Sequence, residues 1–139
     1  MITIGLKVSH GAFEASCKTF NVFRRFVCRS IGGSYPPHEK PGLDGGCWYW
    51  DPNGPFSSKT HQGMKEFLSH SDSEGAIAPE WCEVIADDLE AALPYIAALE
   101  EKEPAYGQLA AMGGFVQATN QFIEGCRLAY ESNELLVFS

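Results

Sequence analysis

Four stretches of this chain carry apolar residues at intervals of three and four, the spacing that places them on one face of a helix. The third stretch opens with Pro79, a favoured residue in a first helical turn, and Pro94 should end or kink it. Gly113 and Gly114 interrupt the fourth stretch, so a close helix crossing or a break into two helices is expected there. The predicted helices cover residues 20–31, 61–69, 79–103 and 104–131.

Short strands are predicted near both ends of the sequence. Residues 2–8 and 12–17 have the pattern of two strands joined by a turn. The apolar run from Leu135 to Phe138 is a third strand, and its expected partner is the N-terminal strand. We therefore predict a single α+β domain over residues 1–139, in which four to five helices pack on a small antiparallel sheet.

Residues 32–60 form a loop rich in glycine and proline, which favour turns and exclude a long helix. Trp48, Tyr49 and Trp50 stand in its middle and are compatible with a further short strand. Successive side chains of a strand point to opposite faces, so these three cannot all be buried on one side. They either hold the loop against the core or form a recognition surface, since Trp and Tyr are favoured as binding anchors.

The net charge of −8 is distributed unevenly along the sequence. Residues 1–69 carry a net charge of +3, residues 70–105 carry −9 and residues 106–139 carry −2. This balance disfavours direct binding of nucleic acid, because contacts to phosphates need cations. It favours a basic protein partner, a bound cation or simple solvation.

Charged residues also define two helix faces. Arg24, Arg25 and Arg29 give the first helix a basic side, expected to face solvent or to contact a phosphate or an acidic partner. The third helix places its carboxylates opposite its apolar stripe, on a solvated face where no raised pKa is expected for Asp87 or Asp88. The candidate binding residues are Glu80, Glu83, Asp87 and Glu90, together with the aromatic residues Trp48, Tyr49 and Trp50.

The segment from His70 to Trp81 joins the second and third helices. Gly75 takes a position that requires a sharp turn, Ile77 is the apolar residue two positions later, and Asp72 and Glu74 are oxygen donors. In this arrangement the segment resembles the loop of the EF-hand, a helix–loop–helix calcium module. The resemblance implies that Ile77 ties the loop to the core and that the two carboxylates are the candidate ligands.

Two positions depart from the EF-hand pattern, which residues 63–93 follow in outline. His70 stands where the first Asp belongs, and Trp81 stands where the bidentate Glu belongs. We therefore predict a loop that keeps the shape without the ion, with Asp72 and Glu74 accepting backbone N–H groups. A divalent-cation site for calcium or zinc at His70, Asp72 and Glu74 is the alternative. The wider segment also resembles parts of uncharacterised small proteins of bacteria and phages, which implies no activity.

Five cysteines form no CxxC pair, and their odd number disfavours a disulfide framework. Cys28, Cys82 and Cys126 fall on apolar helix faces and are predicted core residues. Cys47 lies in the glycine-rich loop and would be a nucleophile if a histidine lay beside it. The sequence contains neither a GxSxG elbow nor a GxxxxGK[ST] phosphate-binding loop.

These features predict a non-enzymatic interaction protein of the cytoplasm. No apolar run reaches the roughly 18 residues that span a bilayer, and the first residues lack the pattern of a secretory signal. The expected partner is a basic protein bound by the acidic helical face, and an inhibitor of a basic host protein made by a phage or mobile element is one specific form. A divalent-cation module and a thiol enzyme that uses Cys47 are the alternatives, and no other cofactor is expected.

Overall fold

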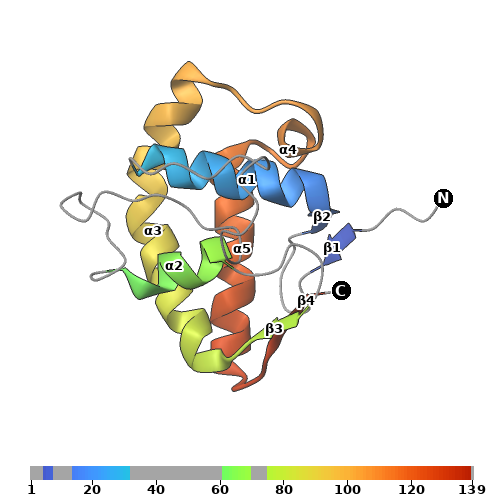
Figure 1. The fold of residues 1–139 in the computed structure, drawn as a ribbon, viewed down its shortest axis with the longest axis vertical. Helices are drawn as coiled ribbons and strands as arrows, with labels where there is room; N and C mark the ends of the chain where they lie inside the picture. Colours follow the sequence, from blue (N-terminus) through green and yellow to red (C-terminus); the bar gives the residue numbers. More distant parts are fainter. Residues whose placement is uncertain (1–4, 8–13, 32–60, 70–74, 139) are drawn as a thin grey trace, which may run out of the picture.

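The computed structural model describes residues 5–7, 14–31, 61–69 and 75–138 (Figure 1). The strands are β1 (Gly5–Lys7), β2 (Glu14–Ser16), β3 (Gly75–Ile77) and β4 (Leu136–Phe138). The helices are α1 (Cys17–Ser30), α2 (Gln62–Ser69), α3 (Pro79–Lys102), α4 (Gly107–Ala111) and α5 (Phe115–Glu131). The described part of the chain is therefore an α+β structure dominated by helices, as the sequence predicts.

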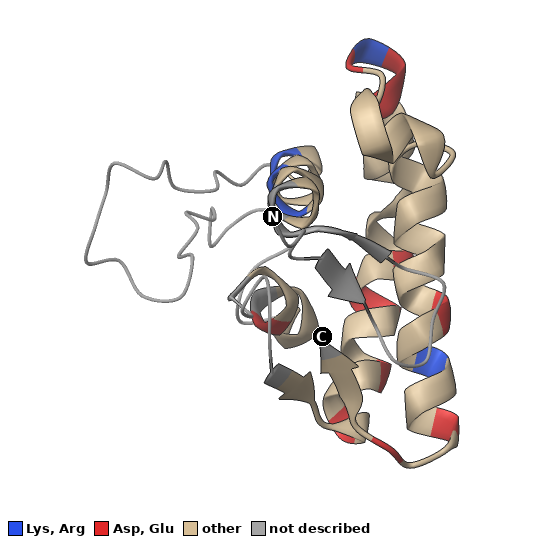
Figure 2. Ribbon diagram, turned by 90° about the vertical axis from the view of Figure 1, so that its right-hand side faces the viewer, with Lys and Arg blue, Asp and Glu red and all other residues tan. Residues whose placement is uncertain are grey.

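The helices form two layers. α3 and α5 lie side by side as an antiparallel pair, and α1 and α2 cross one side of this pair (Figures 1 and 2). Each helix turns its apolar stripe inward, and the buried residues of α3 are Cys82, Ile85, Ala86, Leu89, Ala92 and Ile96. Burial of these stripes against one another is the main force that holds the layers together.

Four phenylalanine side chains form the centre of the core. Phe20 and Phe23 come from α1, Phe67 from α2 and Phe122 from α5, and all four are buried. Their ring centroids lie 5.0–6.3 Å apart, and three of the contacts are edge-to-face, an arrangement that aromatic rings prefer. The predicted apolar spacing of the first and second helices is confirmed by this cluster, whereas Phe122 of α5 lies outside the stripe that the sequence predicted for the last helix.

The strands form two separate antiparallel pairs. β1 pairs with β2, as expected from the N-terminal pattern. β4 pairs with β3, in a register that places Leu136 opposite Ile77, so the expected pairing of the C-terminal strand with an N-terminal strand is wrong. Leu136 and Ile77 are both buried, and this shared burial explains the choice of partner.

Pro94 does not end the third helix, which continues from Pro79 to Lys102. Proline removes one backbone N–H and therefore leaves a carbonyl one turn earlier without its helical donor. Pro94 lies on the exposed side of α3, where solvent can satisfy that carbonyl. The apolar stripe on the opposite side, which runs on to Ile96, holds the two halves in one helix.

The predicted helix over 104–131 is divided by its glycine pair. The N–H of Gly114 donates to the carbonyl of Leu109 and that of Gly113 to the carbonyl of Ala110, the two bonds of a Schellman C-cap. Both glycines have a φ near +100°, which side chains of L-residues rarely permit. Of the two expectations for this pair, the structure therefore shows the break, with α4 before it and α5 after it.

Arg24 is buried, although it was expected on a solvated basic side. Only 3% of the residue is exposed, and its guanidinium donates to the carbonyls of Phe67 and Leu68 at 3.4 and 3.3 Å. The guanidinium also lies 4.6 Å from the centroid of the Phe20 ring. The last carbonyls of a helix lack donors within the helix, so a cation at the end of α2 is stabilising.

Among the described helices, none combines the length and the apolar character that crossing a membrane requires.

Candidate functional site

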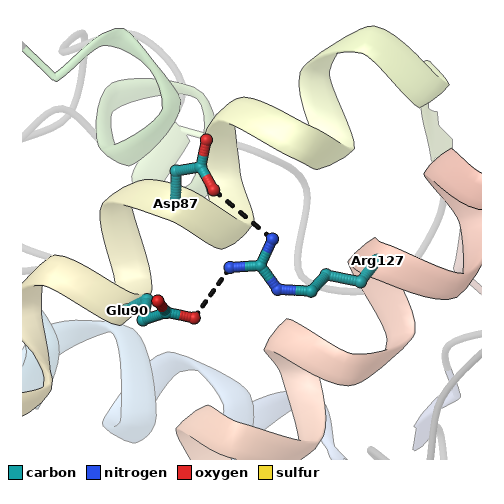
Figure 3. A network of polar contacts seen from close by, with 3 residues as sticks. All are labelled: Asp87, Glu90 and Arg127. Atoms are coloured by element: carbon teal, nitrogen blue, oxygen red, sulfur yellow. Dashed lines mark hydrogen bonds and ion pairs between the residues drawn. The ribbon is translucent and has the colours of Figure 1, made fainter.

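The candidate carboxylates of α3 lie beside α5, and α5 supplies partners for three of them. Arg127 on α5 reaches across to Asp87 at 3.4 Å and to Glu90 at 2.7 Å (Figure 3). The hydrogen bond to Glu90, and then the nearby negative charges, raise the pKa of Arg127. The side chains of Asp87 and Glu90 remain 62% and 61% exposed, so a partner protein can still reach both.

Tyr130 provides the third contact between these helices. Its hydroxyl donates to Glu83, and this hydrogen bond raises the pKa of Tyr130. Together with the Arg127 contacts, it reports the antiparallel register, in which the end of α5 lies beside the start of α3. Figure 2 shows acidic residues gathered where these two helix ends meet, at the bottom of the view.

We name this region the acidic end, and it consists of Glu80, Glu83, Glu131 and Glu134. Glu80, Glu131 and Glu134 are exposed, and Glu83 is half-buried. From Pro79 to Glu134 the sequence holds eleven carboxylates and two cations, Lys102 and Arg127. Lys102 stands at the far end of α3, so the acidic end keeps a negative potential.

Two other carboxylates of α3 cap neighbouring helices. Asp88 accepts the backbone N–H of Met64 at 3.0 Å, near the start of α2. Glu100 accepts the N–H groups of Phe115 and Val116 at 2.7 and 3.2 Å, at the start of α5. The first N–H groups of a helix have no partner within it, so these contacts supply what a local cap would otherwise supply.

Burial raises the pKa of Asp88, and this effect outweighs the opposing hydrogen bonds from the α2 backbone. The prediction of an unperturbed Asp88 on a solvated face is therefore wrong. The sequence shows Asp88 beside the exposed Asp87 but does not show that α2 covers one of the two. Only the three-dimensional packing separates their environments.

The remaining candidates lie wholly or mainly outside the described residues. Trp48, Tyr49, Trp50 and the proposed ligands His70, Asp72 and Glu74 are among the residues that the structure does not describe. In the part of the EF-hand-like segment that is described, Gly75 opens β3 and Ile77 is 2% exposed. Ile77 is therefore a core residue, while the loop before it lies outside the described residues. Within the described ranges, no three His, Cys, Asp or Glu side chains are grouped to hold a metal ion.

The described cysteine side chains behave as core residues. Cys28, Cys82 and Cys126 are fully buried, as predicted. Burial raises the pKa of Cys28 to about 12. A hydrogen bond between the thiols of Cys82 and Cys126 lowers the pKa of Cys82 and raises that of Cys126. Cys47, the candidate nucleophile, lies outside the described residues.

A concave surface that the sequence did not indicate runs between α1 and residues 103–109. It contains two cavities of about 210 and 190 Å³, and both are lined by Val22 and Tyr106. Arg29 and Glu103 form a two-pronged ion pair at the rim of the larger cavity, with N–O distances of 2.9 and 2.6 Å. The arginines that the sequence places along α1 indicated one side of this surface. The other side is formed by residues 103–109, which are distant from α1 in the sequence.

Comparisons with protein-family models, with curated proteins and with solved structures found no match to this chain.

Proposed function

We propose that this protein is a non-catalytic interaction protein of the cytoplasm that binds a basic protein through its acidic end. The observation that carries the proposal is the antiparallel register of α3 and α5. This register places Glu80 and Glu83 beside Glu131 and Glu134, although some fifty residues separate the two pairs in the sequence. A negative surface of this kind speeds and orients the approach of a positively charged partner.

The contacts within the α3–α5 pair support a rigid binding surface. Arg127 and Tyr130 hold Asp87, Glu90 and Glu83 in defined positions, while these side chains stay accessible to a partner. Carboxylates that are already ordered lose less conformational entropy on binding than free ones. An inhibitor that occupies the nucleic-acid-binding surface of a basic host protein is one specific form of this proposal, because it would present similar negative charge.

A matched pair of charge-reversal variants tests the proposal. The first variant carries Glu80→Lys and Glu131→Lys at the acidic end, and the control carries Glu101→Lys and Glu124→Lys at exposed positions elsewhere on the same helices. Both variants change the net charge by the same amount. Binding of a lysine-rich peptide as probe is followed by backbone amide shifts of the ¹⁵N-labelled protein, at low and high salt.

We expect amide shifts at the start of α3 and the end of α5, and weaker binding at high salt. The acidic-end variant should bind at least about tenfold more weakly than the control, because close charges dominate screened interactions. Equal loss in both variants would show that only the net charge matters, and the proposal would then fail. Capture of a protein from a bacterial lysate adds support only if the captured protein is basic and is lost with the acidic-end variant alone.

A further inference from the structure

Tyr106 is shared by the two cavities between α1 and residues 103–109. It precedes α4, lines both cavities and is 71% exposed, the largest exposure among the large apolar side chains of the described residues. A tyrosine that is exposed to this degree gains little from the core and is a typical anchor for a bound partner. This surface lies away from the acidic end, so a ligand here goes beyond the function proposed above.

Each cavity has the size of a pocket for one side chain, and apolar residues form part of its mixed lining. Phe26 and Phe115 line the larger one, and their buried rings stack with centroids 3.6 Å apart. Val22 and Leu109 line the smaller one. An apolar cavity of about 150 Å³ holds a benzene ring, so volumes of about 210 and 190 Å³ are sufficient for a leucine or a phenylalanine side chain.

The rim of the larger cavity is positively charged. Among the described residues that line it, Arg25 and Arg29 are the cations and Glu103 is the one carboxylate. The ion pair with Glu103 uses two of the N–H donors of Arg29, and a guanidinium has five. The sequence of α1 contains no Asp or Glu. In a chain with a net charge of −8, this helix is therefore a surface that complements an anionic group.

We propose that the groove binds an extended acidic peptide segment of a partner protein. One apolar side chain of the segment enters each of the two cavities that share Tyr106, and a neighbouring carboxylate contacts Arg25 and Arg29. Residues i and i+2 of an extended chain point to the same side about 7 Å apart, which suits two adjoining pockets. The residue between them points away and can be acidic without cost.

Three synthetic peptides test the proposal as probes. The first carries leucine at two positions, i and i+2, and aspartate at every other position, so that aspartates also stand on the face of the two leucines. The second replaces leucine with serine, and the third replaces aspartate with lysine. Each is added to the ¹⁵N-labelled full chain, and backbone amide shifts report where and how tightly it binds. We expect saturable binding of the aspartate–leucine peptide at up to millimolar concentration, with shifts at Val22, Tyr106 and Gly107. The serine and lysine peptides should leave these amides unchanged.

Three variants define the site. Tyr106→Ala removes the side chain that lines both cavities, Arg25→Glu reverses one charge of the rim, and Val22→Phe fills the groove. Each should weaken binding of the aspartate–leucine peptide at least about fivefold, the size of loss expected for a central contact. Tyr95→Ala is the control, because this exposed tyrosine of α3 lines neither cavity.

The outcomes separate this proposal from its competitors. Equal binding of the lysine and aspartate peptides, shifts confined to other surfaces, or no saturation by any peptide would each overturn it. If the free protein self-associates and Tyr106→Ala abolishes this self-association, the groove binds a second copy of this chain. That result would also overturn the proposal. Charge reversal at Glu80 and Glu131 should leave the peptide affinity unchanged, so this test can succeed or fail independently of the acidic end.

Discussion

At the scale of single residues, the carboxylates of α3 have two different roles. Asp87 and Glu90 stay exposed beside Arg127, whereas Asp88 and Glu100 point to the backbone of neighbouring helices. The α5 N-cap is Gly114, which has no side chain to accept a hydrogen bond. Glu100 therefore performs the capping function from a position fourteen residues earlier in the chain.

Removal of this cap should destabilise the fold. Glu100→Ala leaves the N–H groups of Phe115 and Val116 without their acceptor, and loss of a cap lowers the free energy of unfolding by about 0.5–2 kcal/mol. Glu100→Gln keeps an acceptor oxygen and should lose less. Urea unfolding of both variants measures the difference, and equal stability of Glu100→Ala and the unsubstituted protein would disprove the capping role.

Asp88 should make the folded protein more stable at low pH than at high pH. A carboxylate in an ordinary salt bridge has the opposite effect. The pKa of Asp88 in the folded protein lies above the ordinary 3.8 because burial disfavours the charged form. The folded state therefore takes up this proton more readily than the unfolded chain. The stability that Asp88 contributes is present below the unfolded pKa and is lost as the pH rises through the folded pKa.

The titration of the Asp88 carboxyl carbon, followed by NMR, measures this directly. A midpoint above 3.8 is expected. A midpoint at or below 3.8 would show that the N–H group of Met64 outweighs burial.

At the scale of secondary-structure elements, α2 depends on its neighbours. It has only eight residues, and isolated helices shorter than about 12 residues are marginal in water. Asp88 of α3 accepts a hydrogen bond near its start, and Arg24 of α1 donates to carbonyls near its end. The two contacts place a negative group at the positive end of the helix dipole and a cation at the negative end.

Substitution of Arg24 should therefore loosen α2 before the rest of the fold. Arg24→Ala removes two charge-assisted hydrogen bonds and the contact with Phe20, which should cost about 1.5–3 kcal/mol. Hydrogen exchange of the amides of α2 should accelerate more than that of α3. Arg29→Ala, at an exposed ion pair on the same helix, is the control and should change stability by less than about 1 kcal/mol. A similar effect of both substitutions would contradict the role of Arg24.

The sequence predicted the elements better than their contacts. The apolar stripes of α1 and α3 are visible because a helix repeats its environment every three to four residues. The three-residue strand β3 is too short to show a period, and its pairing with β4 depends on the shared burial of Ile77 and Leu136. The burial of Arg24 and the caps formed by Asp88 and Glu100 also depend on residues that are distant in the sequence. No local sequence pattern could therefore predict them.

At the scale of the whole molecule, the described residues distribute charge unevenly between the two layers. Arginine residues of α1 face the groove in one layer, and the carboxylates of α3 and α5 dominate the other (Figure 2). The sequence did predict an acidic middle and a basic first helix. It did not predict that α5 would fold back and add its carboxylates to those of α3, because that depends on the antiparallel packing.

Charge reversal at Glu131 should stabilise the fold while it weakens the proposed binding. Glu131 stands in the last turn of α5, which contains no basic residue, and the C-terminal end of a helix favours cations. Glu131→Lys should therefore raise the free energy of unfolding by about 0.3–1 kcal/mol, and relief of repulsion from the nearby carboxylates should add to this at low salt.

Glu124→Lys is the matched control, since it makes the same charge change in the middle of α5, away from the helix end. Urea unfolding at low and high salt gives the stabilities, and titration with the lysine-rich peptide gives the affinities. The expected outcome is that Glu131→Lys gains stability and loses affinity, whereas Glu124→Lys does neither. This outcome would mean that the acidic end keeps repulsive charges that lower stability, as functional surfaces commonly do. A loss of stability in Glu131→Lys would instead place this carboxylate among the contacts that hold α3 and α5 together.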